Sequence, residues 1–496
     1  MKLFIDGKVN RYYIQTLCMI FFPGAKFSED EPDDGSADAL RMTVRKEAEG
    51  IYARAELSSG GKSASGEKLV RFSRDKTEER VEKIACGVAI FKAGKALFGC
   101  TPPWGILTGV RPAKIAEELL ADSGDIFKVR DTLCKEYFVN PKKAALLCDI
   151  VQNEAKLIGS LGKRTCSIYI SIPFCPSRCA YCSFVSYSTK RLLSMIDDYM
   201  VQLCKDIDRI FAHIRAFGFE TVTVYIGGGT PSILSPAQLS MLMDALNRNT
   251  DVSALREFTL EAGRPDTITA EKLRVAVDGG VTRISVNPQT LNDSVLEGIG
   301  RNHTVEDFFR AYNIARESGV KYINTDLIAG LPGESFSSFS RSVDQIIKLR
   351  PENITFHTFC VKKASDFLRN GTEMYSRNGG ETGKSVDYSQ VSAGLSGYIP
   401  YYIYRQKNTV GNFENVGYAL PGCEGLYNVF MMEEVHTVFA AGAGSITKMV
   451  APGRKAILRA DMPKYPYEYL NAEKHDKAAA DADRLIEEFC ATHFPV

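Results

Sequence analysis

In the first part of the chain, apolar and polar residues first alternate one by one and then follow the longer spacing of a helix. Residues 50–57 and 68–72 alternate in this way, which predicts two strands with one buried face. Residues 58–66, between them, are rich in Ser and Gly and predict a flexible turn. Helical spacing follows over residues 77–98. This part of the chain therefore predicts a small α+β unit.

Helical spacing also extends over residues 111–161. Pro112 and Pro141 stand where helices are expected to begin, a position that tolerates proline because its N–H would have no partner there. The segment 160–165 is short and polar and contains Gly162, which is typical of a domain boundary. We therefore expect an N-terminal α+β domain, of unknown role, over residues 1–162.

From residue 166 onward, β-rich runs alternate with helical patterns. Strands are predicted at 167–172, 221–226, 257–261, 283–286, 322–328 and 353–359. Helices are predicted near 189–217, 236–248, 269–279, 304–318 and 336–348. Repeated strand–helix–strand units require parallel pairing with right-handed crossovers, so the pattern predicts a parallel barrel or an open parallel sheet.

The alternation ends near residue 375. A polar stretch rich in Gly and Ser runs to Gly397, aromatic strand-like segments follow, and a charged helix is expected near 472–490. We therefore expect the α/β domain to occupy residues 163–375. A smaller C-terminal α+β domain, covering the active site, is expected over 376–496.

Composition narrows the class of protein. The chain has 496 residues, of which 45% are hydrophobic and 24% charged, as in a soluble globular protein of several domains. Its 61 Lys and Arg nearly balance 60 Asp and Glu, so no overall charge favours nucleic acid or an anionic membrane. The apolar run 16–22 is far shorter than the roughly 20 residues of a spanning helix, and no signal-peptide pattern is present. We expect a cytoplasmic protein with no nucleic-acid partner and no membrane span.

The cysteines favour metal binding over disulfides. Thirteen is an odd number, in a chain without a secretion signal, and most of them lie among apolar neighbours as small core residues do. Cys175, Cys179 and Cys182 differ, because they follow the first predicted α/β strand at close spacing. Three thiolates on a four-iron cubane would leave one iron open to another ligand. A zinc site or an accidental cluster are the alternatives, although zinc would need a fourth Cys or His nearby.

This spacing resembles that of the radical S-adenosylmethionine (SAM) superfamily. The resemblance implies a partial (β/α)6 barrel whose cysteine loop binds a 4Fe-4S cluster. It also implies that the amino and carboxylate groups of S-adenosyl-L-methionine bind the open iron, that Tyr181 packs on the adenine, and that reductive cleavage yields a 5'-deoxyadenosyl radical. A parallel barrel presents its loops at one face, so the other strand ends would reach the same pocket.

Glycines and polar residues stand at or after the ends of the other predicted strands. Gly228, Gly229 and Thr230 follow the second strand, where glycines let backbone groups approach a ligand closely, although a tight turn would also use them. The position is similar to the superfamily's glycine motif for the methionyl amino group. Further residues at such positions are Glu261, Gln289, Arg301 and Asp326, each of which could also be an ordinary polar loop residue.

Together these residues are similar to the coproporphyrinogen III dehydrogenase branch, the HemN, HemW and HemZ group. In that group, matching Tyr, Glu, Gln, Arg and Asp residues contact S-adenosyl-L-methionine, and Tyr169 corresponds to the tyrosine. The turn 330–334 is also shared, and the resemblance spans roughly residues 166–450. The segments 103–112, 261–266, 404–408 and 414–418 and the extra N-terminal domain most resemble the HemZ type.

Two departures from the branch keep a second hypothesis open. Phe184 stands where the HemN enzymes carry another cysteine, as in HemW-type haem chaperones, and one extra residue precedes Pro265. The leading hypothesis is an oxygen-independent coproporphyrinogen III dehydrogenase, a radical SAM oxidoreductase of haem (porphyrin) biosynthesis that converts two propionates to vinyls and forms protoporphyrinogen IX. The alternative is a HemW-like chaperone that binds and transfers haem.

The first hypothesis implies partners and substrate contacts. We expect coproporphyrinogen III or another tetrapyrrole as substrate, flavodoxin or ferredoxin as electron donor, and a monomeric protein. Propionates need basic partners, and Arg264 and Arg301 lie near the cofactor motifs. Arg405 and Lys407 are looser candidates, for which a place at the solvated surface is the stronger expectation. His303 and His357 lie near predicted strand ends. Each could contact the substrate, although a hydrogen-bonded structural role is the stronger expectation.

Overall fold

The computed structural model describes residues 1–28, 38–73, 76–182, 187–360, 380–406 and 409–495. These residues form two compact units. The first contains the described residues up to 152, together with 380–386 and 403–415. The second contains the described residues of 153–360, 387–402 and 416–495. The division into three domains at 162 and 375 stays a prediction.

The first unit is built on a four-stranded sheet in the order β1-β2-β3-β4. Its strands are β1 (Lys2–Asp6), β2 (Ala39–Lys46), β3 (Gly50–Ser59) and β4 (Lys62–Arg71). The helices up to residue 160 are α1 (Arg11–Phe21), α2 (Glu78–Phe98), α3 (Pro112–Ser123), α4 (Ile126–Lys135) and α5 (Pro141–Ile158). Helix α2 packs on β3 and β4. Both prolines predicted at helix starts are the first residues of their helices, which confirms those predictions.

The predicted flexible turn at 58–66 is wrong. Strands β3 and β4 run on through it and pair antiparallel as far as Ser59 and Lys62. Only Gly60 and Gly61 form the turn, with φ of +56° and +76°. Two consecutive residues with positive φ match the right-handed twist of a tight hairpin, and only glycine adopts both at little cost. The Ser-rich residues that suggested flexibility are therefore paired strand residues.

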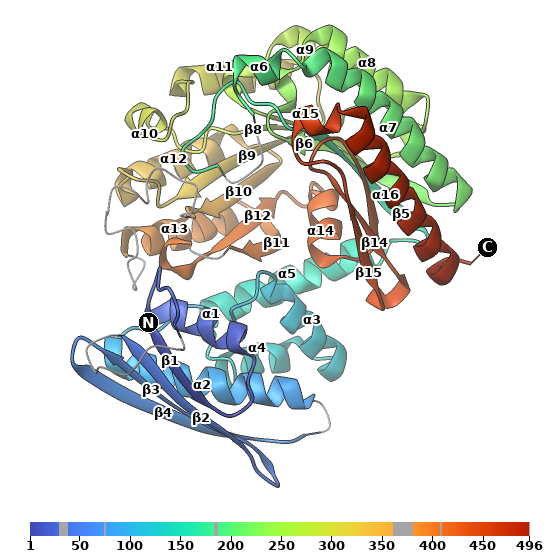
Figure 1. Ribbon diagram of the computed structural model, residues 1–496. Coiled ribbons are helices and arrows are strands. Elements are labelled where there is room, and N and C mark those ends of the chain that lie inside the picture. The colour runs from blue at the N-terminus through green and yellow to red at the C-terminus, as the bar shows by residue number, and fades with distance from the viewer. Residues whose placement is uncertain (29–37, 74–75, 183–186, 361–379, 407–408, 496) are drawn as a thin grey trace. The chain divides into compact units, whose positions relative to one another are not determined.

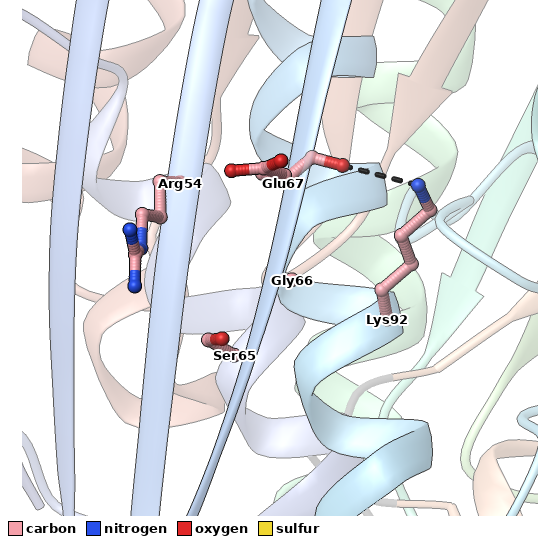
Figure 2. Close-up of a pocket in the computed structure, with 5 residues that line it drawn as sticks. All are labelled: Arg54, Ser65, Gly66, Glu67 and Lys92. Atoms are coloured by element: carbon pink, nitrogen blue, oxygen red, sulfur yellow. Dashed lines mark hydrogen bonds between the residues drawn. The ribbon is translucent and has the colours of Figure 1, made fainter.

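A polar hollow of about 390 Å³ lies where this hairpin meets α2 (Figure 2). It is lined by Arg54, Ser65, Gly66, Glu67 and Lys92. The Lys92 ammonium donates to the Glu67 backbone carbonyl at 3.1 Å. A Cβ on Gly66 would stand 2.4 Å from the Ala89 carbonyl oxygen, so glycine allows β4 to approach the helix closely.

A buried charged group holds residues 403–415 against the rest of the first unit. The Lys143 ammonium lies 2.7 Å from Glu414, and their side chains are 4% and 0% exposed. The Trp104 indole N–H donates to the other Glu414 oxygen at 2.8 Å. Arg405 lies over the Trp104 ring and donates to the Leu107 carbonyl, so the expectation that it is a solvated surface residue is wrong. Burial lowers the pKa of Arg405 to about 10, an effect that Glu414 opposes.

The second unit carries the predicted α/β strands. They are β5 (Thr165–Ile172), β6 (Glu220–Gly228), β7 (Glu257–Gly263), β8 (Arg283–Val286), β9 (Tyr322–Ala329) and β10 (Asn353–Thr358). All neighbouring pairs from β5 to β10 are parallel, as predicted. Most of their residues are buried, because a parallel sheet with helical crossovers is covered on its faces. The predicted α/β fold, with a partial parallel barrel, is confirmed.

Helices connect these strands and lie along the outside of the sheet (Figure 1). They are α6 (Lys190–Leu193), α7 (Ile196–Ala216), α8 (Pro236–Asn247), α9 (Ala270–Asp278), α10 (Asp293–Gly298), α11 (Val305–Glu317) and α12 (Phe336–Leu349). Helix α8 begins at a capping box, in which Ser235 and Gln238 bond each other's backbone N–H. The helix predicted over 189–217 is divided into α6 and α7 at residues 194–195.

The C-terminal elements extend this sheet at both edges. The full order of the eleven described strands is β11-β12-β10-β9-β8-β7-β6-β5-β13-β14-β15. These added strands are β11 (Ile399–Arg405), β12 (Glu414–Ala419), β13 (Thr437–Ala441), β14 (Ile446–Val450) and β15 (Ile457–Asp461). The helices are α13 (Gly380–Leu395), α14 (Leu426–Glu433), α15 (Pro466–Tyr469) and α16 (Ala472–His493). Among the described helices, none has the length and hydropathy needed to cross a bilayer.

Candidate functional site

The cysteine loop begins where β5 ends, and backbone hydrogen bonds hold its two sides. The Cys175 N–H donates to the Tyr187 carbonyl at 3.1 Å, and the Tyr187 N–H donates to the Pro173 carbonyl at 2.9 Å. Further along, the Ala180 N–H donates to the carbonyl of Ile299 at 3.0 Å. The carboxyl ends of parallel strands share one edge, so the loop lies where the other strand ends can reach it. Phe184 lies outside the described residues.

Each of two cysteine thiols accepts a hydrogen bond from another strand end. Cys175 is buried, and the Thr230 hydroxyl donates to its sulfur at 3.3 Å. Cys179 is partly exposed, and the Arg264 guanidinium donates to its sulfur at 3.7 Å. No disulfide joins any of the 13 cysteines. These thiols are therefore chemically available as thiolate ligands, held by donors that favour negative charge on sulfur.

Tyr181 and Arg301 meet beside the cysteines. The Arg301 Nε donates to the Tyr181 hydroxyl at 3.3 Å, and Arg301 Nη1 is buried without a partner. Both ring nitrogens of His303 are likewise buried and unpartnered, so the expected hydrogen-bonded structural role of this histidine is not found. Burial and the neighbouring Arg301 lower the pKa of His303 to about 4. Buried donors without partners are costly, which indicates a place where a bound group supplies the missing acceptors.

The glycines after β6 lie against other strands. Gly228 has φ of +112°, a backbone conformation that side chains disfavour. Its N–H is hydrogen-bonded to the Glu261 carboxylate. A Cβ on Gly229 would stand 2.5 Å from the Phe174 carbonyl oxygen and 2.9 Å from its backbone nitrogen. The glycines are therefore required by close backbone approach between β6 and the start of the cysteine loop.

Replacing Gly229 with alanine is expected to destabilise the second unit by about 1–3 kcal/mol, because the added methyl would force backbone apart. Gly298→Ala is the matched control, since no atom lies within 4 Å of its added Cβ and alanine favours a helix. Urea denaturation of the cofactor-free protein, followed by circular dichroism, measures both. Equal midpoints for the two variants would contradict the close approach.

Glu261 lies at the centre of the polar strand ends. It accepts a hydrogen bond from the Tyr225 hydroxyl, and the Tyr225 ring stacks on Tyr427 with 4.4 Å between centroids. Tyr169 stacks on Tyr225 at 6.2 Å. Burial raises the pKa of Glu261 to about 7, despite the opposing hydrogen bond from Tyr225. Burial therefore disfavours the charged form of this carboxyl group.

The raised pKa predicts a pH-dependent stability. An unfolded Glu has a pKa near 4.5, so between that pH and about 7 the folded chain keeps a proton that the unfolded chain has lost. Glu261 therefore lowers the free energy of unfolding as pH rises through this window. In Glu261→Gln this decrease should be absent. The free energy of unfolding of the variant, relative to that of the wild type, should therefore rise by on the order of 3 kcal/mol from pH 5 to pH 8. Urea denaturation at both pH values measures it, with the exposed Glu271→Gln as control; a pH-independent difference would contradict the shift.

Asp326 is held as an anion by groups from β9, β10 and the residue that follows β8. Asn287 and Asn324 donate to its two carboxylate oxygens at 2.9 and 2.8 Å. His357 Nε2 lies 3.5 Å from the same carboxylate. Burial alone would raise the pKa of Asp326, but these hydrogen bonds, led by that of His357, hold it below its ordinary value. The carboxylate is therefore a fixed negative charge inside the sheet.

Gln289 is connected to Asp326 through the backbone. Its N–H donates to the Asp326 carbonyl at 3.0 Å, and its carbonyl accepts from Ile328 at 2.9 Å. Gln289 has φ of +69°, which is uncommon for a residue with a side chain, and its Oε1 is buried without a partner. Such strain at a strand end is typical of ligand sites.

The predicted residues thus lie in linked groups, among them the cysteine loop with Thr230 and the pair of Gln289 and Asp326. The described residues contain no preformed metal centre. No three His, Cys, Asp or Glu side chains among them have a geometry that would hold a metal ion. The donor chemistry nevertheless fits a thiolate-ligated cluster: three cysteines in one loop, two of them with hydrogen-bond donors aimed at sulfur. Metal binding and loop ordering are commonly coupled, and ligation by these three residues is therefore a proposal.

Comparison with known proteins decides the family. Residues 169–346 match the profile of the Radical SAM superfamily. The chain is 33% identical over 498 residues to the "Oxygen-independent coproporphyrinogen-III oxidase-like protein HemZ" of Bacillus subtilis (strain 168), covering 98% of each protein. The chain belongs to the radical SAM family of coproporphyrinogen oxidase-like proteins. The cofactors of this family are a 4Fe-4S cluster and S-adenosyl-L-methionine.

Two further proteins are similar to parts of the chain. It is 37% identical over 202 residues to the "Heme chaperone HemW" of B. subtilis (strain 168), covering 40% of this chain and 52% of that protein. The solved structure of coproporphyrinogen III oxidase (HemN) from Escherichia coli matches with a TM-score of 0.51 and 22% identity, over 66% of this chain and 73% of that one. The HemN match supports the radical SAM fold alone.

Several residues of this candidate site were not predicted as contacts. Asn287 and Asn324 each lie two residues before a predicted site residue, and this period of two could have indicated them. Tyr225 lies on β6, three residues before Gly228. Tyr427 had no such signal, because it comes from α14, far along the chain. Arg264, one of the two arginines noted near the cofactor motifs, is paired with Asp266. Lys407 lies outside the described residues.

Proposed function

We propose that this chain is an oxygen-independent coproporphyrinogen III dehydrogenase, in which Cys175, Cys179 and Cys182 are the ligands of the 4Fe-4S cluster. The observation that carries the proposal is the 33% identity to an oxygen-independent coproporphyrinogen-III oxidase-like protein across 98% of both chains, N-terminal unit included. The linked groups among the cysteine loop, glycines and carboxylates support it from the structure.

When bound, the cluster and S-adenosyl-L-methionine would supply a radical that takes one β-hydrogen atom from a propionate. The propionate then loses carbon dioxide, one electron passes to an acceptor, and a vinyl group is left. Two propionates react in this way, so two molecules of S-adenosyl-L-methionine are consumed for each protoporphyrinogen IX. An electron donor such as flavodoxin or ferredoxin is part of the proposal.

The chain's own residues would bind and orient S-adenosyl-L-methionine. Arg301 carries a buried N–H without an acceptor, which suits a carboxylate. Asp326, kept ionised by its neighbours, suits an ammonium or a ribose hydroxyl. The full proposed set of contacts is Tyr169, Tyr181, Gly228, Gly229, Thr230, Glu261, Gln289, Arg301 and Asp326.

The C-terminal part is proposed to cover this site. Tyr427 of α14 supports that proposal, because it stacks on Tyr225 beside Glu261. The stacked rings would exclude water from the carboxyl group. The N-terminal unit is proposed to dock substrate, reductant or acceptor, a role supported only by its presence in the full-length relative.

The test is product analysis under strict anaerobiosis. The reconstituted protein, with S-adenosyl-L-methionine, a chemical reductant and coproporphyrinogen III, is expected to form a divinyl product with two 5'-deoxyadenosines per porphyrinogen. Arg301→Gln should lose most of this activity while keeping its iron. Cleavage of S-adenosyl-L-methionine without any vinyl product would overturn the dehydrogenase assignment.

Haem transfer is the second candidate, favoured by the 37% identity to a haem chaperone over 202 residues. Titration of the purified protein with haem distinguishes it. A shift of the haem Soret band at micromolar haem, together with no vinyl product, would favour the chaperone. The absence of any shift would exclude it.

A further inference from the structure

Arg264 stands directly before Pro265, and hydrogen bonds hold its side chain in a single orientation. It is 4% exposed, directly after β7. Its Nε and Nη2 donate to the two oxygens of Asp266, both at 2.9 Å. This bidentate pairing fixes the plane of the guanidinium and offsets its charge. Asp266 is correspondingly held as an anion: burial alone would raise its pKa, but the hydrogen bond and charge of Arg264 lower it.

The rest of the guanidinium faces the cysteine loop. Nη1 and Nη2 both donate to the Ser177 hydroxyl at 3.1 Å. Nη1 also donates to the Cys179 sulfur at 3.7 Å. A guanidinium has five N–H donors, and these contacts with Asp266, Ser177 and Cys179 use all five. The orientation of Arg264 therefore leaves one N–H directed at one specific thiol.

A hydrogen bond to a cluster sulfur has a defined electronic effect. Reduction adds negative charge to the cluster and its thiolates, and an N–H donor stabilises that charge, so the reduction potential rises. Charge-assisted donors are roughly twice as strong as neutral ones. Cys175 has the neutral hydroxyl of Thr230 as its donor, whereas Cys179 has a buried guanidinium. The two ligands would therefore differ, with the larger effect at Cys179.

We propose that Arg264 is a positioning residue that sets the reduction potential of the cluster through its hydrogen bond to Cys179. This inference rests on the proposed ligation of the cluster by the cysteine loop. It assigns Arg264 to the electron-transfer step, and it removes Arg264 from the residues available to bind a substrate carboxylate.

The test is a redox titration of the reconstituted full-length protein, followed by the electron paramagnetic resonance signal of the reduced cluster. Arg264→Gln keeps a hydrogen-bonding group but no charge, and Arg264→Lys keeps the charge without the fork. Arg274→Gln, an exposed arginine on α9, is the matched control. At the wild-type midpoint potential, the ratio of reduced to oxidised cluster should fall about tenfold in Arg264→Gln, equivalent to about 59 mV for one electron. In Arg264→Lys this ratio should fall less, and in Arg274→Gln it should not change.

Iron content separates the failures. A wild-type protein that binds no cluster would overturn the proposed ligation, and with it this inference. An Arg264→Gln protein with full iron and the wild-type potential would overturn the inference alone. If Arg264→Gln loses its iron, the result for Arg264→Lys decides. A reduction potential below that of the wild type in Arg264→Lys supports the inference. A wild-type potential in Arg264→Lys, or loss of its iron, overturns the inference, because Arg264 would then only hold the loop.

Discussion

Replacing Cys179 with serine is expected to abolish cluster binding, and with it all cleavage of S-adenosyl-L-methionine. A hydroxyl is a far weaker ligand for iron than a thiolate, and three protein ligands leave no spare one. Iron should fall from about four atoms per chain to background. Cys175→Ser and Cys182→Ser should behave alike. Iron and sulfide analysis, with 5'-deoxyadenosine formation measured under dithionite, tests all three.

The expected loss is chemical and not a consequence of misfolding. Cys179 is partly exposed, and its sulfur accepts a single described hydrogen bond, from Arg264, which a serine oxygen could also accept. Cys423→Ser, also partly exposed but outside the cysteine loop, is the matched control and should keep full iron. Full iron in Cys179→Ser would contradict the ligand assignment, and zinc in place of iron in the wild type would favour the structural zinc alternative.

Glu414→Gln is expected to destabilise the first unit by about 3–5 kcal/mol, the usual cost of removing one member of a buried ion pair. Glutamine has the same shape and can still accept from the Trp104 indole. It carries no charge, however, so the buried ion pair with the Lys143 ammonium, which is 4% exposed, is lost. Glu414 also raises the pKa of the buried Arg405, so its replacement removes a charge that stabilises the Arg405 guanidinium.

Trp104 makes this measurement specific. It is the one tryptophan of the chain and is 0% exposed, so its fluorescence during urea denaturation reports the first unit. Asp131→Asn is the control, because its pair with Lys135 is exposed and worth at most about 0.5 kcal/mol. Adding Lys143→Met to Glu414→Gln should recover part of the loss, since both members of the pair are then neutral. An unchanged fluorescence midpoint in Glu414→Gln would contradict the buried-pair account.

Local patterns predicted the central strands well. The strand predicted at 283–286 is β8 with the same bounds, and the other five predicted strands coincide with β5–β7, β9 and β10 to within a few residues. Buried parallel strands are short apolar runs bounded by turn residues, which can be recognised from the sequence alone. Strand β1 and helix α1 were not predicted. Strand β1 is five residues long and depends on pairing with β2, more than thirty residues away.

The residues of the candidate site were likewise predicted only in part. Spacing within one loop singled out the three cysteines, and position after a strand singled out Gly229 and Gln289, because the edge at which parallel strands end is set by topology. The stacking of Tyr427 on Tyr225 could not be anticipated, since it joins α14 to β6. The pairing of Arg264 with Asp266 and Cys179 was also not predicted.

The sequence by itself therefore determined the class of fold, the family and the cysteine loop, because these depend on periodicity and on residues close together in the chain. Only the tertiary structure decided which charges are neutralised, which donors are left without acceptors and which thiol receives a guanidinium. Those properties depend on distances between strand ends, and burial makes each such contact strong and each missing partner costly. Two arginines illustrate the difference: Arg301 keeps a buried N–H without an acceptor, while every N–H of Arg264 is used.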